Sequence, residues 1–239
     1  MDLLEVTDAF CRELRGLNFG PPVTHVYNPL EYARAAYDRY LSRYGAPPKQ
    51  AVFLGMNPGP WGMAQTGVPF GEVELVRRWL GIEEPVGGPC EEHPRRKVLG
   101  FDCRRSEASG RRFWGWARAS FGTPEKFFDR FFVANYCPLL FLEESGRNRT
   151  PDRLPPAERK ALLEVCDRAL VGTIEFLRPR YVIGIGRFAE ERALRALGHL
   201  DVRIGRVTHP SPASPLANRS WEARIDRELA DILGADPSA

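Results

Sequence analysis

The sequence lacks a long run of apolar residues. A helix that crosses a bilayer needs about 20 consecutive apolar residues, and no stretch of the 239 residues approaches that length. Residues 1–14, MDLLEVTDAFCREL, carry acidic side chains and show helical periodicity, unlike a secretory signal peptide. We therefore expect an intracellular protein without a membrane partner, cytoplasmic and nucleoid-associated in a bacterium or nuclear in a eukaryote.

Cysteines are few, and their spacing is irregular. The five cysteines stand at positions 11, 90, 103, 137 and 166. In a reducing compartment such an odd, scattered set indicates buried thiols rather than disulfides. Cys90 and His93, with Cys103 and Cys137, resemble part of a metal site, but structural zinc sites usually combine two closely spaced pairs. We expect no metal and no cofactor.

A strong excess of one charge is also missing. The 34 Lys and Arg residues are nearly balanced by 31 Asp and Glu residues, which leaves a net charge of +3. So mild a charge does not by itself indicate a nucleic-acid partner. Arginines do cluster at 95–96, at 104–105, at 111–112, and at 147 with 149. A solvated face explains such clusters unless other features point to DNA.

The sequence does contain short apolar runs that alternate with amphipathic segments. The apolar runs predict buried parallel strands over residues 51–55, 131–136, 181–186 and 202–207. Helices are predicted over 3–15, 30–44, 72–80, 113–121, 124–128, 155–177, 187–197 and 221–233. This order predicts the α/β class, with three α/β/α layers around a central, mostly parallel, four-stranded sheet. We expect one domain over residues 1–239, of which 1–45 form a helical N-terminal part.

Two loops that leave predicted strands carry asparagines. The loops at the carboxyl ends of parallel strands build the site in such folds. The first loop, 55–70, is stiffened by glycines and prolines, and Asn57 at its start either holds a water or polar ligand or caps the turn. Asn135 begins the second loop, 135–141, and presents its carboxamide either to a ligand edge or to neighbouring backbone. The residues support these alternatives about equally for Asn135.

A third loop, and one competing motif, follow later strands. His209 opens the proline-rich segment 209–218 at the edge where ligands bind, which favours a functional over a structural histidine. Residues 184–189, GIGRFA, match the G-x-G-x-x-A fingerprint of dinucleotide-binding folds. The acidic residue expected about 20 positions later is missing, and Arg203–Gly205 stand there instead. Close helix–strand packing explains these glycines adequately.

Taken together, the three loops resemble the single-strand-selective monofunctional uracil-DNA glycosylases. The stretch GMNPGPWGMAQTGVPFGEV at 55–73 is similar to the first motif of that family. NYCPLLF at 135–141 and SGRNRTP at 145–151 fit its middle segment, and HPSPASP at 209–215 fits its second motif. The resemblance runs from about residue 20 to the C-terminus. It implies a uracil-DNA glycosylase fold and a DNA repair hydrolase.

An asparagine in the first motif together with a histidine in the second also separates this group from its relatives in the superfamily. Classical uracil-DNA glycosylases are expected to carry an aspartate where this chain has Asn57. Mismatch-specific uracil/thymine glycosylases share the Asn-Pro-Gly start but lack the histidine of the second motif. Iron–sulfur members need a cysteine set that the spacing here does not supply.

The resemblance also implies roles for individual residues. Asn57 positions the attacking water, and His209 donates to, or lies beside, the uracil O2. Without a lysine in either motif, we expect hydrolysis without strand cleavage. Asn135 reads the uracil edge, and the remaining pocket residues are Met56, Gly59, Met63 and Phe70. Phe70 is the expected stacking platform, Gly59 leaves space for 5-hydroxymethyluracil, and either methionine is equally consistent with the core.

Single- and double-stranded uracil-containing DNA is the partner that the resemblance implies, bound by a monomer. Residues 210–219 are expected to enter the duplex where the base has flipped out. The family pattern places a large basic residue where Ala213 stands, so Leu216 or Arg219 would have to compensate. Further predicted DNA contacts come from Pro210, Ser211, Pro212, Arg147 and Arg149. The rival functions are a base-flipping binding module without catalysis and a nucleotide-dependent oxidoreductase using 184–189.

Overall fold

A four-stranded parallel sheet forms the centre of the computed structural model, which describes residues 1–212 and 220–234. Its strands lie in the order β3, β2, β6, β7. Their bounds are Ala51–Gly55 for β2, Phe131–Asn135 for β3, Tyr181–Ile185 for β6 and Arg203–Val207 for β7. The four predicted strands are therefore confirmed to within a residue at each end.

Burial explains why the two central strands read as continuous apolar runs. Every residue of β2 and of β6 is buried, as expected for strands covered on both faces. The edge strand β7 keeps only Val207 buried. The parallel register sets Gly55 opposite Asn135, so the loops that follow β2 and β3 leave the sheet side by side.

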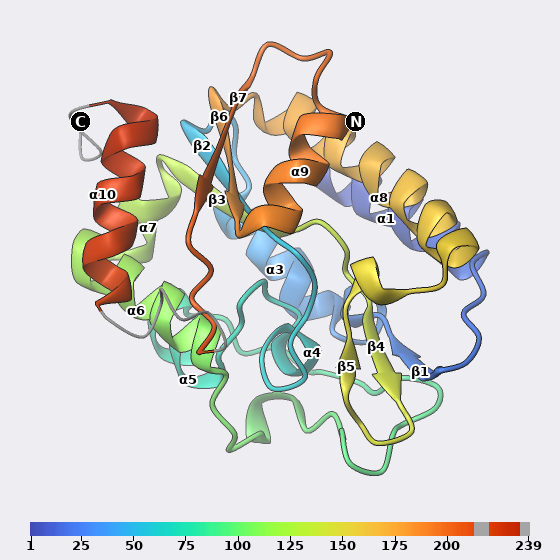
Figure 1. The fold of residues 1–239 in the computed structure, drawn as a ribbon. Helices are drawn as coiled ribbons and strands as arrows, with labels where there is room; N and C mark the ends of the chain where they lie inside the picture. Colours follow the sequence, from blue (N-terminus) through green and yellow to red (C-terminus); the bar gives the residue numbers. More distant parts are fainter. Residues whose placement is uncertain (213–219, 235–239) are drawn as a thin grey trace.

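Helices cover both faces of this sheet (Figure 1). On one side lie α1 (Leu3–Arg15), α8 (Pro156–Leu177) and α9 (Arg187–Ala196). On the other side lie α6 (Ala108–Phe121), α7 (Pro124–Phe128) and α10 (Trp221–Leu233). Helix α3 (Arg34–Tyr44) packs along β3, where the Tyr40 hydroxyl donates to the Val133 carbonyl at 2.8 Å. The three-layer prediction is confirmed.

Several helix boundaries differ from the prediction for local reasons. The segment 30–44 breaks at Ala33 into α2 (Pro29–Tyr32) and α3. The segment 72–80 forms α5 (Val73–Leu75) and a π-helical turn, η1 (Val76–Leu80). Helix α6 begins five residues earlier than predicted, because the Glu107 carboxylate accepts from the amides of Ser109 and Gly110 and caps it. A short helix, α4 (Met63–Thr66), interrupts the first loop.

A second, antiparallel sheet was not predicted. It orders β1 (Val23–Tyr27), β4 (Leu140–Glu143) and β5 (Asn148–Arg149), and it lies below α8 in Figure 1. Residues 140–141 belong to β4 and not to the predicted loop 135–141. Strand β4 is short, and its partner β1 lies more than 100 residues earlier, so no local turn signal marks the pairing. Two 3₁₀ turns, η2 (Gly100–Asp102) and η3 (Pro151–Arg153), complete the elements described.

None of the helices in the described part of the chain has both the length and the apolar character needed to span a bilayer.

Candidate active site

A cavity of about 270 Å³ opens where the carboxyl ends of β2, β3 and β7 meet. The three loops that follow these strands supply most of its wall, and residues at the start of α6 and at β5 supply the rest. Eight of the residues singled out in the sequence line it, namely Met56, Asn57, Gly59, Met63, Phe70, Asn135, His209 and Ser211. The structure thus brings together the three loops that the sequence marked.

Asn57 is held in one orientation at the end of β2. Its Nδ2 donates to the carbonyl of Leu139 at 3.3 Å. Backbone bonds from Tyr136 N to Gly55 O and from Cys137 N to Met56 O, both 2.9 Å, continue the β2–β3 pairing past the strands. Because the amide nitrogen is committed to Leu139, the Oδ1 of Asn57 is the end of the carboxamide left to accept a hydrogen bond in the cavity.

Asn135 and Phe70 are packed directly over Gly55. A Cβ on Gly55 would lie 2.3 Å from Asn135 Oδ1 and 2.8 Å from Phe70 Cε2, so only glycine fits. Phe70 itself has a φ of 53°, in the left-handed region that a phenylalanine rarely adopts. Its ring stacks on Phe113 with 5.1 Å between centroids and lies 6.2 Å from the ring of His209. The amide and the aromatic ring therefore lie next to each other at the cavity wall.

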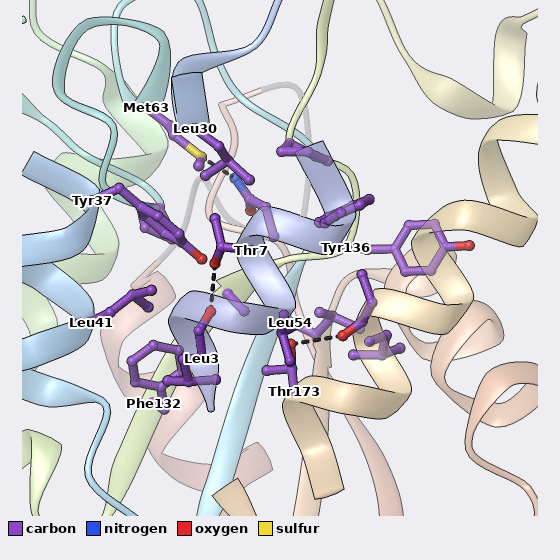
Figure 2. Close-up of a pocket in the computed structure, with 18 residues that line it drawn as sticks. Leu3, Thr7, Leu30, Tyr37, Leu41, Leu54, Met63, Phe132, Tyr136 and Thr173 are labelled. Atoms are coloured by element: carbon purple, nitrogen blue, oxygen red, sulfur yellow. Dashed lines mark hydrogen bonds between the residues drawn. The ribbon is translucent and has the colours of Figure 1, made fainter. Parts of the chain in front are cut away.

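A smaller, mostly apolar cavity of about 40 Å³ lies behind Asn135, among α1, α3 and α8 (Figure 2). Met63 and Tyr37 stand on its wall. The Nδ2 of Asn135 donates to Met63 Sδ at 3.1 Å, which is the dashed contact at the sulfur in Figure 2. Met63 therefore fixes the rotation of the Asn135 amide in addition to lining the cavity.

His209 follows β7 as a half-buried, neutral imidazole. Burial lowers its pKa to about 4. Its Nδ1 accepts from the backbone N–H of Ser211 at 3.0 Å, so Nδ1 carries no proton and the neutral ring carries it on Nε2. A Cβ on Gly186, whose φ is 90°, would approach the His209 side chain to 3.5 Å. The imidazole is therefore a fixed donor rather than an acid at neutral pH.

Side chains distant in sequence fix the backbone on both sides of this histidine. Glu228 accepts from the Thr208 amide at 2.6 Å and from its hydroxyl at 2.7 Å. Trp221 Nε1 donates to the Thr208 carbonyl at 2.8 Å. On the other side, the Arg112 guanidinium donates to the carbonyl of Pro210 at 2.8 Å. Helices α6 and α10 together hold this part of the loop.

Comparison with known proteins identifies the family. Residues 42–230 match the family model of the uracil DNA glycosylase superfamily. A protein of Bos taurus named single-strand selective monofunctional uracil DNA glycosylase is 54% identical over 227 residues, covering 94% of this chain and 83% of that protein. A Mus musculus protein of the same name is 52% identical over 222 residues, covering 92% and 80%. The chain belongs to this glycosylase family.

The glycosylase fold is also found in a solved structure. The crystal structure of wild-type SMUG2 from Pedobacter heparinus matches with a TM-score of 0.66 and covers 95% of this chain and 96% of its own. At 17% identity that likeness concerns the fold alone. The predicted uracil-DNA glycosylase fold and enzyme class are both confirmed.

Five residues of the glycosylase cavity were missed by the sequence analysis: Pro58, Glu107, Ser109, Asn148 and Thr150. Burial raises the pKa of Glu107, even though its carboxylate receives two backbone amides. Asn148 donates from Nδ2 to the Pro58 carbonyl at 3.3 Å, whereas its Oδ1 is buried without a donor among the described residues. Asn148 lies within the stretch 145–151, which resembles the middle segment of the family, but nothing in 81–110 marked Glu107.

The predicted DNA contacts fall in three places. Arg147 and Arg149 lie off the cavity, beside a neighbouring depression that shares Asn148 and Thr150 with it. Arg149 pairs there with Glu143 at 2.9 Å. Pro210 and Pro212 lie directly before the end of the first described range, and Ala213, Leu216 and Arg219 lie outside the described residues.

The competing motifs have structural explanations. A Cβ on Gly184 would lie 2.4 Å from the backbone nitrogen of Glu190, so this glycine lets α9 pack closely on β6. Cys103 and Cys137 are buried, and Cys90 is exposed. Across 1–212 and 220–234, no three His, Cys, Asp or Glu side chains converge in a way that could hold a metal ion.

Proposed function

We propose that this glycosylase hydrolyses the N-glycosidic bond of a uracil flipped out of DNA into the cavity of about 270 Å³, without cleaving the strand. The observation that carries the proposal is that Asn57, Asn135 and His209 line the same cavity, although they follow three different strands. A base inside a duplex cannot reach such a cavity, so the nucleotide has to rotate out of the stack. Both single- and double-stranded DNA then offer a substrate.

His209 supports departure of the base. As the glycosidic bond breaks, negative charge develops on the uracil ring. A fixed N–H donor in a dry site stabilises such charge without reorganisation. With Nδ1 occupied by Ser211, the Nε2–H of the neutral imidazole is the group that would donate a hydrogen bond to O2, without transferring its proton.

Asn57 supports attack by water. Its Nδ2 is bound to Leu139, and its Oδ1 would accept a hydrogen from the water and hold it below the sugar. The sugar becomes positively charged as the base leaves, so a held water can attack it without a strong base. This division of roles accounts for an asparagine at position 57.

Asn135 would distinguish uracil from cytosine. Its Oδ1 accepts from N3–H, and its second Nδ2 hydrogen, the one that does not face Met63, donates to O4. Cytosine presents the opposite pattern, and each group left unpaired costs about 1–3 kcal/mol. Phe70 would stack on the base. A Cβ on Gly59 would still lie 3.5 Å from its nearest neighbour, Glu107, which supports acceptance of 5-hydroxymethyluracil.

Segment 210–219 would occupy the gap left by the flipped base, with Arg147, Arg149 and Ser211 on neighbouring phosphates. An alanine at position 213 would fill such a gap less than a large basic side chain would. Replacing Ala213 with arginine is expected to strengthen duplex binding. Equal duplex affinity of both proteins would remove position 213 from the interface.

The direct test is release of free base from a uracil-containing oligonucleotide, single- or double-stranded. The wild-type protein should release uracil, and Asn57→Ala and His209→Ala should each lose most of the activity, by about 100-fold or more. Retained activity in both variants would refute the assigned roles. No release by the wild-type protein would refute uracil as the substrate.

A further inference from the structure

Trp61 and two arginines form a cluster at the surface, in the stretch between Gly59 and Met63. The guanidinium carbon of Arg105 lies 4.5 Å from the centroid of the Trp61 ring, and that of Arg96 lies 5.3 Å from it. These distances are typical of cation–π contacts. Trp61 is half-buried and Arg105 is exposed. Both guanidinium groups contact the same indole ring, so their central carbons lie at most about 10 Å apart.

This cluster lies at the rim of the catalytic cavity. Trp61 is two residues from Gly59 and from Met63, and Arg105 is two residues from Glu107, all three of which line the cavity. Two residues of chain span at most about 7 Å. Gln65 Nε2 bonds the carbonyls of both Pro60 and Lys97, at 2.9 and 3.0 Å, and so ties the backbone beside Arg96 to the same loop.

The two guanidiniums are not neutralised by the protein. Across the described residues, neither Arg96 nor Arg105 lies within ion-pair distance of a carboxylate, whereas Arg77 and Arg78 both pair with Glu74. Arg96 donates from one terminal nitrogen to the Arg95 carbonyl at 3.0 Å. Its Nε is buried, and no acceptor among the described residues reaches it. Placing two like charges together without a counter-ion is costly unless an anion joins them.

We propose that Trp61, Arg96 and Arg105 form a phosphate subsite for the DNA strand next to the flipped nucleotide, named here the rim subsite. The guanidiniums bind one backbone phosphate through charge-assisted hydrogen bonds, and the indole keeps both in place before the strand arrives. This inference rests on the proposed function for the identity of the strand. It adds a contact that needs no paired partner strand, and it therefore acts on single-stranded substrates as well.

The rim subsite is tested by measuring DNA binding and catalysis separately. Fluorescence anisotropy of a labelled single-stranded uracil oligonucleotide gives affinity at several salt concentrations. The variant Arg96→Ala/Arg105→Ala should bind about tenfold more weakly, and the slope of log affinity against log salt should shrink by about 0.7, the value for one phosphate on a single strand. In base release, KM should rise about as much while kcat stays within about twofold of wild type.

Three further comparisons locate the effect. Trp61→Phe keeps an aromatic face and should bind like wild type, whereas Trp61→Ala should reproduce part of the loss. A series of oligonucleotides each carries one neutral methylphosphonate, at a different position in each. At one of these positions the neutral group should weaken binding by the wild-type protein but not binding by the double variant. Arg180→Ala is the matched control. Arg180 also lies over an aromatic ring, that of Tyr181, but at the amino end of β6, opposite to the strand ends that form the cavity.

An unchanged affinity and salt slope in the double variant would overturn the rim subsite, even if the wild-type protein releases uracil. An equal loss in Arg180→Ala would also overturn it, because general charge would then explain the effect. The two proposals can also fail separately. If the wild-type protein released no base, but the double variant still bound DNA more weakly and with a smaller salt slope than wild type, the glycosylase proposal would be refuted and the rim subsite supported.

Discussion

The two segments that bring the central groups to the cavity are built in different ways. The first loop, 55–70, holds Asn57 mainly through the backbone: glycines, the α4 turn, and hydrogen bonds to main-chain groups of residues 136–139, which directly follow β3. The segment 208–212 holds His209 through side chains of α6 and α10 that do not themselves line the cavity. Backbone pairing and close packing around glycine therefore hold the first segment, and side-chain hydrogen bonds hold the second. The two should therefore fail differently when they are altered.

The largest expected effect is a pH dependence of stability that arises in the second segment. The pKa of His209 is about 4 in the folded protein, below the ordinary value of 6.5, because the ring is buried. The unfolded chain binds the proton more readily, so the neutral ring contributes its full stability above about pH 6.5 and loses it as pH falls toward 4. The contribution is up to about 3 kcal/mol.

Urea unfolding measures this pH dependence as the free energy of unfolding of the wild-type protein and of His209→Gln, each at about pH 7 and about pH 4. The variant should lose less stability on acidification. His199→Gln, which alters an exposed histidine, should keep the wild-type difference. A wild-type pH dependence in His209→Gln would assign the effect to other groups.

In the first segment, Gly55→Ala should produce the next largest effect. The added methyl group would lie 2.3 Å from Asn135 Oδ1 and 2.8 Å from the Phe70 ring, so both must shift. A displacement of about 1 Å at a reacting site can cost about 100-fold in rate. We expect a loss of that size in kcat/KM for base release.

The matched control is Gly115→Ala in α6, where a Cβ would meet nothing within 4 Å. That variant should keep full activity and gain stability, because alanine favours a helix by up to about 1 kcal/mol over glycine. Equal activity of Gly55→Ala and wild type would show that the first loop tolerates movement of Asn135.

A smaller effect is expected from Glu228→Gln, which weakens the bracing of the second segment. The carboxylate accepts both from the Thr208 amide and from its hydroxyl, and a glutamine has only one carbonyl oxygen to replace the two. We expect kcat to fall about tenfold with little change in KM, because the histidine acts on the leaving base. Steady-state base release measures both parameters.

Glu222→Gln, at an exposed position on the same helix, provides the control and should behave like wild type. If Glu228→Gln raised KM and left kcat intact, the bracing would serve strand binding instead of the histidine.

The same contrast explains how much of the molecule the sequence could predict. Strands 51–55 and 181–186 were predictable because burial on both faces leaves continuous apolar runs, and Asn57 was predictable because its loop is locally unusual. The pairing of β4 with β1, and the contacts of Arg112 and Glu228 beside His209, join residues separated by 20 to more than 100 positions. Such contacts leave no periodic signal, so sequence patterns found the histidine but not what holds it.

The smallest effect is expected from replacing Glu107, and this change also tests whether the first loop acts without a carboxylate base. Glu107 is the carboxylate of the cavity wall, it packs against Gly59 and Gly62, and burial raises its pKa. If its function is to cap α6, Glu107→Gln should cost about 1 kcal/mol of stability or less, because the amide oxygen still accepts one backbone N–H. Base release should stay within about threefold of wild type.

Glu72→Gln separates capping from catalysis, because Glu72 is also a buried N-cap, accepting from Leu75 N at 3.0 Å, but it is not part of the cavity wall. The two variants should lose similar stability and keep similar activity. A loss of about 100-fold in Glu107→Gln alone, with a changed pH profile, would make Glu107 the base that Asn57 is not. Water attack would then depend on a residue outside both family motifs, and the first loop would hold its catalytic group through α6, as the second segment does.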